Sequence, residues 1–161
     1  MTIQEMQSLV DRSLFATLAY SDEQGRIQVR RVFCTWHRGL SDHLISTNTS
    51  SAHVCDLMRD GRASLYFADD ERFEGLNLTG RVTVHHERPW KELLWHEGDE
   101  KYYPAGVDDP DYCVLEFVAD GGRFYRFDGK GSLNRADLGA CAGKAYADTY
   151  ALFHGEQRDT Q

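Results

Sequence analysis

The sequence of 161 residues lacks a long apolar run, an export signal and an excess of basic residues. No stretch approaches the roughly 20 apolar residues of a membrane-spanning helix. The opening residues, MTIQEMQSLVDRS, have neither the basic region nor the apolar core of a signal peptide. The formal net charge is −8, whereas a general nucleic-acid binder needs a basic surface to meet the phosphates. We therefore expect a cytoplasmic protein that has neither a membrane nor a nucleic acid as its partner.

Closely spaced metal ligands are absent as well. His85 and His86 are adjacent, and on a strand two neighbouring side chains point to opposite faces. No C-x-x-C pair occurs among the four cysteines, which are Cys34, Cys55, Cys113 and Cys141. This scatter predicts buried thiols and no metal site, because zinc ligands usually come in close pairs.

The apolar residues that are present alternate with polar ones in short runs, a pattern typical of half-buried strands. Gly80 indicates a bulge or bend within one run, and Asp120, Gly121 and Gly122 indicate the turn of a hairpin. So many short strands predict a mainly β fold of six or seven antiparallel strands closed into a barrel. The predicted strands cover residues 15–20, 27–36, 43–46, 62–67, 73–86, 112–118 and 123–127.

Helices are few and short in this interpretation. An opening helix that Thr2 can cap has one apolar face, formed by Ile3, Met6, Leu9 and Val10. Shorter helices are predicted around residues 54–58 and 87–95, and residues 136–153 are moderately helical. The length fits one domain. Residues 1–130 form the barrel, and residues 131–161 form a partly helical C-terminal extension that belongs to the same domain or to a dimer interface.

Six small polar residues in a row, Ser46 to Ser51, stand directly before the second helix. Hydroxyls at the start of a helix are a ready anion site, because the first-turn N–H groups lack intrahelical partners and the helix dipole favours negative charge. The alternative is that Ser50 or Ser51 only caps the helix. In the second predicted strand, Arg30 and Arg31 interrupt apolar residues, so each lies at an edge or pairs with an anion.

Two groups of motifs, spread over roughly residues 5–129, carry a family resemblance. We call the six small polar residues 46–51 the hydroxyl turn. The chain resembles the pyridoxamine 5′-phosphate oxidase-like FMN-binding split barrel in the run V-R-R-V-F at residues 29–33 and in the hydroxyl turn with the helix and two strands that follow it. Trp95, the pair Tyr103-Pro104 and the run G-V-D-D-P-D at residues 106–111 are similar to the general stress protein branch of that family. The resemblance implies an antiparallel split β-barrel with short flanking helices, and it places the aspartates of residues 106–111 in a structural turn.

The resemblance also implies a homodimer with FMN at the subunit interface. Arg30 would hold the flavin phosphate together with the hydroxyl positions of the turn. Val32 and Phe33 would lie along the isoalloxazine ring, and Trp95 would approach the cofactor of the other subunit. The FMN-binding residues implied in this way are Arg30, Arg31, Val32, Phe33, Ser46, Thr47, Ser51, His53 and Trp95.

One departure concerns the phosphate. Where the family often has Ser-Arg-Lys, this chain has Ser51-Ala52-His53. Each charge-assisted hydrogen bond contributes about 1.5–3 kcal/mol, so the loss of two cations weakens FMN binding unless other residues compensate. Arg30, Arg31, Arg62 or a protonated His53 could do so. Alternatively, His53 is a solvent-facing helix residue, and the pocket takes another ligand or none.

No residue has the surroundings of a dedicated nucleophile or general base, which suits a cofactor that carries the electron chemistry. We therefore expect a flavin-dependent oxidoreductase that acts on a small redox substrate or a nicotinamide nucleotide. The alternative is a stress-response protein that holds a flavin or haem without turnover. A third possibility is a dimer without a ligand, whose pocket is filled by side chains such as Trp36, Trp95 or Tyr103.

Overall fold

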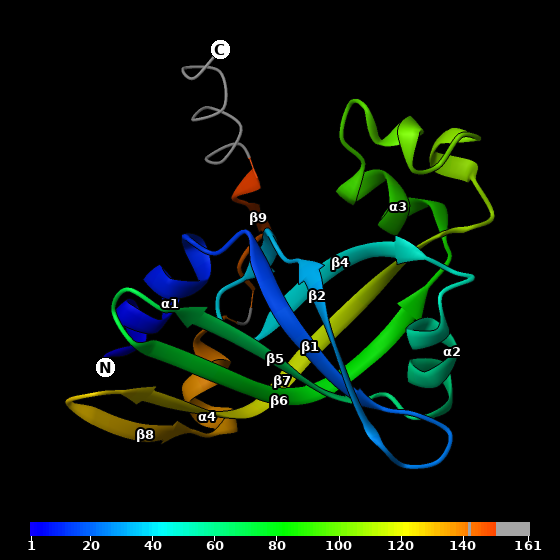
Figure 1. Ribbon diagram of the computed structural model, residues 1–161. Helices are drawn as coiled ribbons and strands as arrows, with labels where there is room; N and C mark the ends of the chain where they lie inside the picture. The colour runs from blue at the N-terminus through cyan, green and yellow to red at the C-terminus, as the bar shows by residue number, and fades with distance from the viewer. Residues whose placement is uncertain (142, 151–161) are drawn as a thin grey trace.

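The computed structural model describes residues 1–141 and 143–150. These residues form one curled antiparallel sheet whose strand order is β2-β1-β5-β6-β7-β4-β3-β9, with β8 beside β7 (Figure 1). This confirms the predicted mainly β fold with a barrel-like sheet. The strands are β1 (Phe15–Ser21), β2 (Ile27–Phe33), β3 (Trp36–Arg38), β4 (Asp42–Asn48), β5 (Arg62–Asp69), β6 (Glu74–His85), β7 (Tyr112–Arg126), β8 (Gly129–Leu133) and β9 (Ala147–Asp148).

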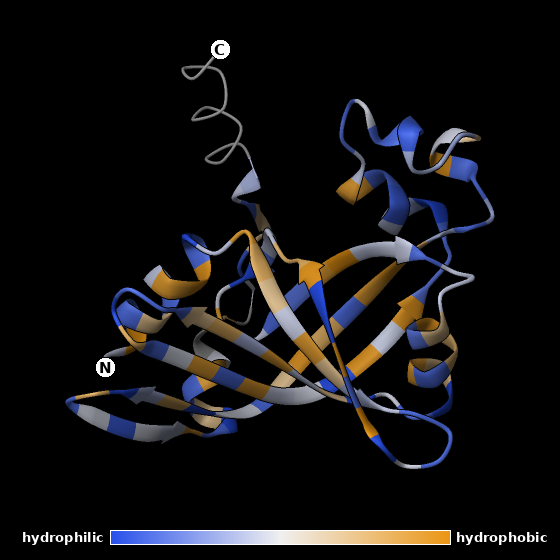
Figure 2. Ribbon diagram, in the orientation of Figure 1, coloured by the Kyte–Doolittle hydropathy of each residue, from blue (hydrophilic) through white to orange (hydrophobic). Residues whose placement is uncertain are grey.

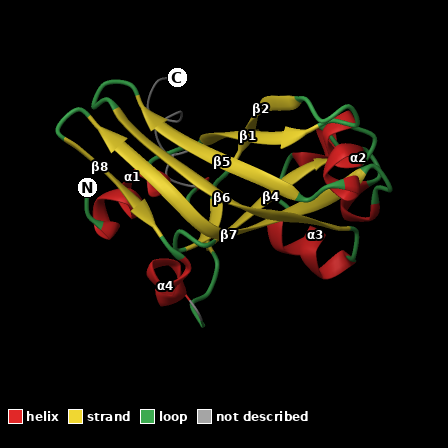
Figure 3. Ribbon diagram, turned by 90° about the horizontal axis from the view of Figure 1, so that it is seen from below, coloured by secondary structure: helices red, strands yellow, loops and turns green. Residues whose placement is uncertain are grey.

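Short helices lie at the ends of the sheet. In the view of Figure 3, α1 lies at one end, and α2 and α3 lie at the other. The Thr2 hydroxyl accepts the N–H of Glu5, and the Glu5 carboxylate accepts the N–H of Thr2, so the predicted cap is confirmed. None of the helices in the described part of the chain is both long and apolar enough to cross a bilayer. The α-helices are α1 (Ile3–Asp11), α2 (Ala52–Arg59), α3 (Arg88–Leu94) and α4 (Arg135–Leu138).

Two apolar clusters hold these elements together. Apolar and polar residues alternate along the strands (Figure 2), so each strand turns one apolar side inward. The larger cluster fills the inside of the sheet and includes Leu18, Phe67 and Phe117. The smaller cluster consists of Leu44, Leu94, Tyr103, Tyr112 and Val114. Because Leu44 and Val114 come from β4 and β7 and Leu94 comes from α3, the smaller cluster fixes α3 beside β4.

The hairpin predicted around Asp120 does not exist. Residues 112–126 form one strand, β7, which stays paired with β6 through Gly121 and Gly122. A Cβ on Gly122 would lie 2.8 Å from the carbonyl oxygen of Asn77, so glycine here allows a close approach of two backbones. The chain turns back only between β7 and β8, at residues 127–128.

The second predicted strand is also interrupted. β2 ends at Phe33 and pairs with β1, whereas β3 begins at Trp36 and pairs with β4. The intervening Cys34 is buried, and its N–H donates to the carbonyl of Leu14. The chain therefore passes from one side of the curled sheet to the other within two residues.

The C-terminal extension is much less helical than the pattern of residues 136–153 predicted. α4 covers only Arg135–Leu138, and β9 pairs with β3. Residues 142 and 151–153 of that prediction lie outside the described residues. β8 crosses the boundary predicted at residue 130 and pairs with β7, so the barrel sheet continues into the extension.

The cysteine prediction needs one correction. Cys34, Cys113 and Cys141 are buried, as expected, but Cys55 is exposed on α2. Val54 and Leu57 occupy the buried face of that helix, which leaves Cys55 on the solvent side.

The bulge predicted at Gly80 is confirmed, because the register between β6 and β7 shifts between Thr79 and Gly80. A Cβ on Gly80 would lie 2.0 Å from the carbonyl oxygen of Val118, within the paired backbone. We predict that Gly80→Ala lowers the free energy of unfolding by about 1–3 kcal/mol, the usual range for overpacking. Gly129→Ala is the matched control, because a Cβ there meets nothing within 4 Å. Urea denaturation gives the free energy of unfolding of both variants. Equal losses would contradict the close backbone approach at Gly80.

Candidate functional site

The sheet does not close between β2 and β4. β2 pairs only with β1 among the described strands. β4 pairs along its whole length with β7, but with β3 only at residues 42–44. Within residues 1–141 and 143–150, the other edge of residues 45–48 therefore has no strand partner. β2 and β4 still lie in contact, so two free backbone edges face each other, and we call the gap between them the split.

Three side chains from three elements cross the split. The guanidinium of Arg30 on β2 is hydrogen-bonded to Nδ1 of His53 on α2, and Nε2 of His53 lies 2.9 Å from the hydroxyl of Thr47 on β4. Arginine can only donate, so Nδ1 must be the acceptor. Nε2 then carries the proton and donates it to Thr47. The contacts thus define His53 as a neutral imidazole with an assigned tautomer.

Burial supports the neutral state of His53. Its residue surface is 1% exposed, and burial lowers its pKa to about 4, with the positive charge of Arg30 acting in the same direction. The prediction that a protonated His53 adds positive charge is therefore wrong near neutral pH. The alternative of a solvent-facing residue is wrong too, because the side chain lies between β2 and β4.

The carboxylate of Asp111 forms hydrogen bonds to the hydroxyl turn, residues 46–51. The Asp111 carboxylate accepts the N–H of Ser50 and the side-chain amide of Asn48, each at 2.8 Å, and the Asp111 carbonyl accepts the N–H of Thr49. Ser51 occupies the N-cap position of α2, but its hydroxyl makes no capping hydrogen bond. Neither Ser50 nor Ser51 therefore serves as the simple side-chain cap that the alternative interpretation offered.

The neighbouring aspartates have structural partners. The Asp109 carboxylate accepts the N–H groups of Ala105 and Asp111, and Asp108 pairs with Arg88. This is the structural turn that the resemblance implied for residues 106–111. In the described part of the chain, no three His, Cys, Asp or Glu side chains are grouped so that they could hold a metal ion.

Arg31 and Arg62, the other two arginines considered from the sequence, have partners elsewhere. The Arg31 guanidinium lies over the ring of Phe15, 5.2 Å from its centroid. Arg62 forms an ion pair of 2.7 Å with Asp60, beyond the C-terminal end of α2. Of the arginines considered from the sequence, only Arg30 contacts a residue that crosses the split.

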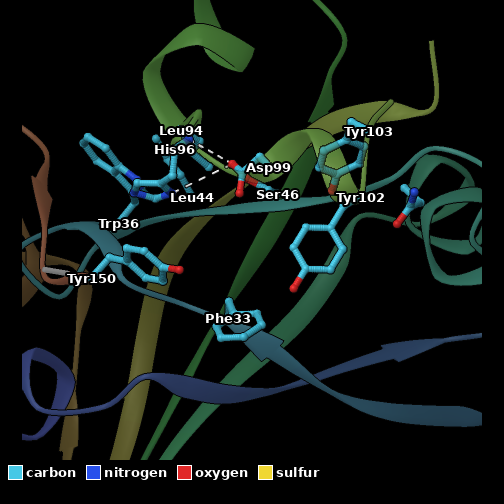
Figure 4. A pocket seen from close by; sticks show the side chains of 11 residues that line it. Phe33, Trp36, Leu44, Ser46, Leu94, His96, Asp99, Tyr102, Tyr103 and Tyr150 are labelled. Atoms are coloured by element: carbon cyan, nitrogen blue, oxygen red, sulfur yellow. Dashed lines mark hydrogen bonds and ion pairs between the residues drawn. The ribbon is translucent and has the colours of Figure 1, made fainter. Parts of the chain in front are cut away.

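A cavity of about 220 Å³ opens beside the split, between β4 and the segment that follows α3 (Figure 4). Phe33 enters it from β2, and Ser46 enters it from β4. Aromatic rings dominate the walls, and Asp99 is the acidic group among them. The lining residues are Phe33, Trp36, Leu44, Ser46, Asn48, Leu94, His96, Asp99, Tyr102, Tyr103 and Tyr150.

The predicted site residues thus separate into groups. Arg30, Thr47 and His53 form the bridge, and Phe33 and Ser46 line the cavity. Other residues have different surroundings: Val32 is buried in the core, and Trp95 packs on Tyr103 and Tyr112.

Sequence reasoning missed one wall of the cavity. Nε2 of His96 lies 2.7 Å from a carboxylate oxygen of Asp148 on β9, and the His96 ring stacks on Tyr150. Asp99 accepts the backbone N–H of His96. The only signal for this wall was the crowding of aromatic and acidic residues at positions 95–103, which has no period. Its partner, β9, is too short to predict.

Residues 2–126 match the family model described as pyridoxamine 5′-phosphate oxidase. The chain belongs to the pyridoxamine 5′-phosphate oxidase family. The family predicted from the sequence is thereby confirmed.

Solved structures of similar proteins support this membership in the pyridoxamine 5′-phosphate oxidase family. A Clostridium acetobutylicum protein, described as related to general stress protein 26 of Bacillus subtilis and as belonging to the pyridoxinephosphate oxidase family, is 36% identical, with a TM-score of 0.77. The match covers 84% of this chain and 96% of that chain. General stress protein 26 from Bacillus anthracis is 11% identical, with a TM-score of 0.67, and the match covers 82% of this chain and 97% of that one.

A third structure shares the fold under a different description. A haem-binding protein from Mycobacterium smegmatis is 17% identical, with a TM-score of 0.70, and the match covers 86% of this chain and 60% of that chain. At this identity the likeness concerns the fold alone. None of the curated proteins matches the sequence significantly.

The neutral state of His53 predicts how stability depends on pH. The unfolded imidazole binds a proton near its ordinary pKa of 6.5, whereas the folded one does so only near 4. Stability from this group is therefore fully present above pH 6.5 and is lost as the pH falls toward 4. We predict that His53→Gln, which keeps an acceptor and a donor but does not titrate, flattens this acid-side loss by on the order of 2 kcal/mol.

Urea denaturation at several pH values between 4 and 7 measures this difference. The charged and titratable groups around His53 are Arg30, Asp56 and Tyr20, and all three are unchanged in the variant. His43, whose pKa burial also lowers to about 4, contributes equally to both proteins. Parallel pH profiles for the wild type and the variant would show that His53 titrates normally.

Proposed function

We propose that this protein binds a flavin in the split between β2 and β4 and that the bound flavin exchanges electrons with a small redox substrate or a nicotinamide nucleotide. The observation that carries the proposal is an aromatic cavity to which both β2 and β4, the strands that the Arg30–His53–Thr47 bridge joins, contribute residues, in a chain of the pyridoxamine 5′-phosphate oxidase family. FMN is the flavin that the family resemblance implies. When bound, a flavin supplies the hydride and electron chemistry, while the protein supplies position and surroundings.

The cavity suits a flat ring with polar edges. Phe33, Trp36 and Tyr102 offer aromatic surface from β2, β3 and the loop after α3. The indole N–H of Trp36 is buried and has no hydrogen-bond partner in the described part of the chain, so it is a donor available to a ring carbonyl or nitrogen. The volume of about 220 Å³ is below the roughly 300–1,000 Å³ of most ligand pockets. This size supports a site that a second subunit completes.

The chain's own residues have three tasks in this proposal. The aromatic walls exclude water from the ring, and Leu44 and Leu94 close the apolar floor. The bridge keeps β2 and β4 at a defined separation, so that Phe33 and Ser46 stay on opposite sides of the cavity mouth. The start of α2 leaves first-turn N–H groups without intrahelical partners, and these would be donors for the polar tail of the ligand. No residue here needs to act as a general base.

The first test concerns the contact between Phe33 and the flavin ring. We predict that the protein binds riboflavin and FMN saturably and that Phe33→Ala weakens both about tenfold, as the loss of an aromatic contact of up to 1.5 kcal/mol implies. Quenching of flavin fluorescence gives the dissociation constants. Phe127→Ala is the matched control, since Phe127 is also an exposed phenylalanine but does not line the cavity. The absence of saturable binding in the wild type would refute the proposal.

Turnover separates an oxidoreductase from a flavin carrier. If a nicotinamide nucleotide bleaches the bound flavin and oxygen or a quinone restores its absorbance repeatedly, the protein is an oxidoreductase. If the flavin binds but is not reduced, the protein holds it without turnover.

We also propose that the protein is a homodimer built on the outer face of β2. Ile27, Val29 and Phe33 alternate on this face, and Val29 is 64% exposed. We predict that Val29→Glu converts a dimer to a monomer in analytical ultracentrifugation, because it places a charge in an apolar interface. Met58→Glu on the exposed side of α2 is the control and leaves the mass unchanged. A wild-type monomer at micromolar concentration would contradict the dimer.

Haem binding without turnover is the second candidate function. His96 lines the cavity, and the fold is shared with the haem-binding protein of M. smegmatis. Against this candidate, Nε2 of His96 is already hydrogen-bonded to Asp148, so axial ligation would have to use Nδ1 or break that bond. A Soret band on titration with haem, without any flavin binding, would favour it over the flavin.

A further inference from the structure

The polar end of the split has an unusual charge for an anion site. We define this tail end as Arg30 on β2, Thr47 on β4, and Ser51 and His53 at the start of α2. Arg30 is the single cation in this set. Its guanidinium is already hydrogen-bonded to His53, so even this cation is partly committed to holding the split together.

His53 adds no charge, and this follows from the contacts alone. Its Nδ1 accepts from a group that can only donate, and its Nε2 faces the Thr47 hydroxyl at 2.9 Å. A protonated ring would present an N–H to the N–H of Arg30 and would break the bridge. The depressed pKa of His53 agrees with this argument.

Two carboxylates act on the tail end or on the residue beside it. The Asp111 carboxylate lies under the hydroxyl turn, 2.8 Å from the N–H of Ser50. Asp56 on α2 acts on His53 electrostatically, and its own salt bridge goes to Arg59 at the far end of the helix. Ala52, the first residue of α2, is exposed and carries no polar side chain.

We infer that the tail end of the split selects a flat ring compound whose polar tail carries no more than one negative charge, rather than one that ends in a phosphate monoester. One guanidinium can match one negative charge. The second charge of a phosphate near neutral pH would find no cation among these four residues, and the Asp111 carboxylate lies on the neighbouring Ser50. An uncompensated charge in a partly buried site is costly. This inference rests on the proposed binding of a flavin.

Riboflavin and FMN are the probes, because they share the ring and differ by the terminal phosphate. In the wild type FMN is expected to bind no more tightly than riboflavin. In Ala52→Arg, which adds a cation at an exposed position of the first turn of α2, FMN is expected to bind at least tenfold more tightly, since one charge-assisted hydrogen bond is gained. Riboflavin binding is expected to stay unchanged.

Two further variants serve as a charge control and as a second way to add a cation. Met58→Arg adds the same charge to the exposed side of the same helix, near its C-terminal end, and should alter neither constant. His53→Lys adds the cation inside the split. It is expected to raise FMN affinity if it folds, which circular dichroism checks, and Ala52→Arg decides the question without it.

The outcomes separate this inference from the proposed function. Wild-type protein that binds FMN more than a hundredfold more tightly than riboflavin overturns the inference and leaves flavin binding intact. Comparable gains for FMN in Ala52→Arg and Met58→Arg also overturn it, because the effect would then come from net charge. Failure of both flavins to bind the wild type and Ala52→Arg overturns the proposed function and the inference together.

Discussion

The site depends on one constraint, which is that the curled sheet stays open between β2 and β4 in the described part of the chain. Here the chain leaves β2 at Phe33 and re-enters the sheet as β3 at Trp36, on the other side of the gap. The backbone groups of β2 and of the far half of β4 are therefore left facing each other. The imidazole of His53 bridges the gap between Arg30 and Thr47, so three side chains replace a row of missing ladder bonds.

Segments that lie far apart in the sequence complete the site around this gap. Asp111, which comes just before β7, holds the turn at Ser50, and Tyr112 donates its hydroxyl to the carbonyl of Lys91 on α3. The loop after α3 then brings Tyr102 to the cavity that Phe33 enters from β2. The aromatic cluster beside α3 thus packs this helix on the sheet, and its members Leu44, Leu94 and Tyr103 also line the cavity.

Local patterns in the sequence were sufficient for most of the sheet. Alternation placed the long strands, and Gly80 was identified as a bulge because glycine in a strand usually marks one. The hairpin predicted at Gly121 and Gly122 was wrong because glycine occurs both in turns and where two backbones approach closely. Only the position of β6 beside these residues shows that the second case applies here. The ionisation state of His53 and the wall formed by His96 depend on contacts over 23 and 52 residues, which no local pattern contains.

The residue at position 53 therefore decides between two uses of Arg30. A lysine has three donors and no acceptor, so it could not receive the guanidinium of Arg30 and would repel it. Both cations would then be free for an anion. Histidine in its neutral form accepts from Arg30 and donates to Thr47, so it braces β2 against β4. A neutral histidine at this position thus links the two strands across the split and adds no charge to it.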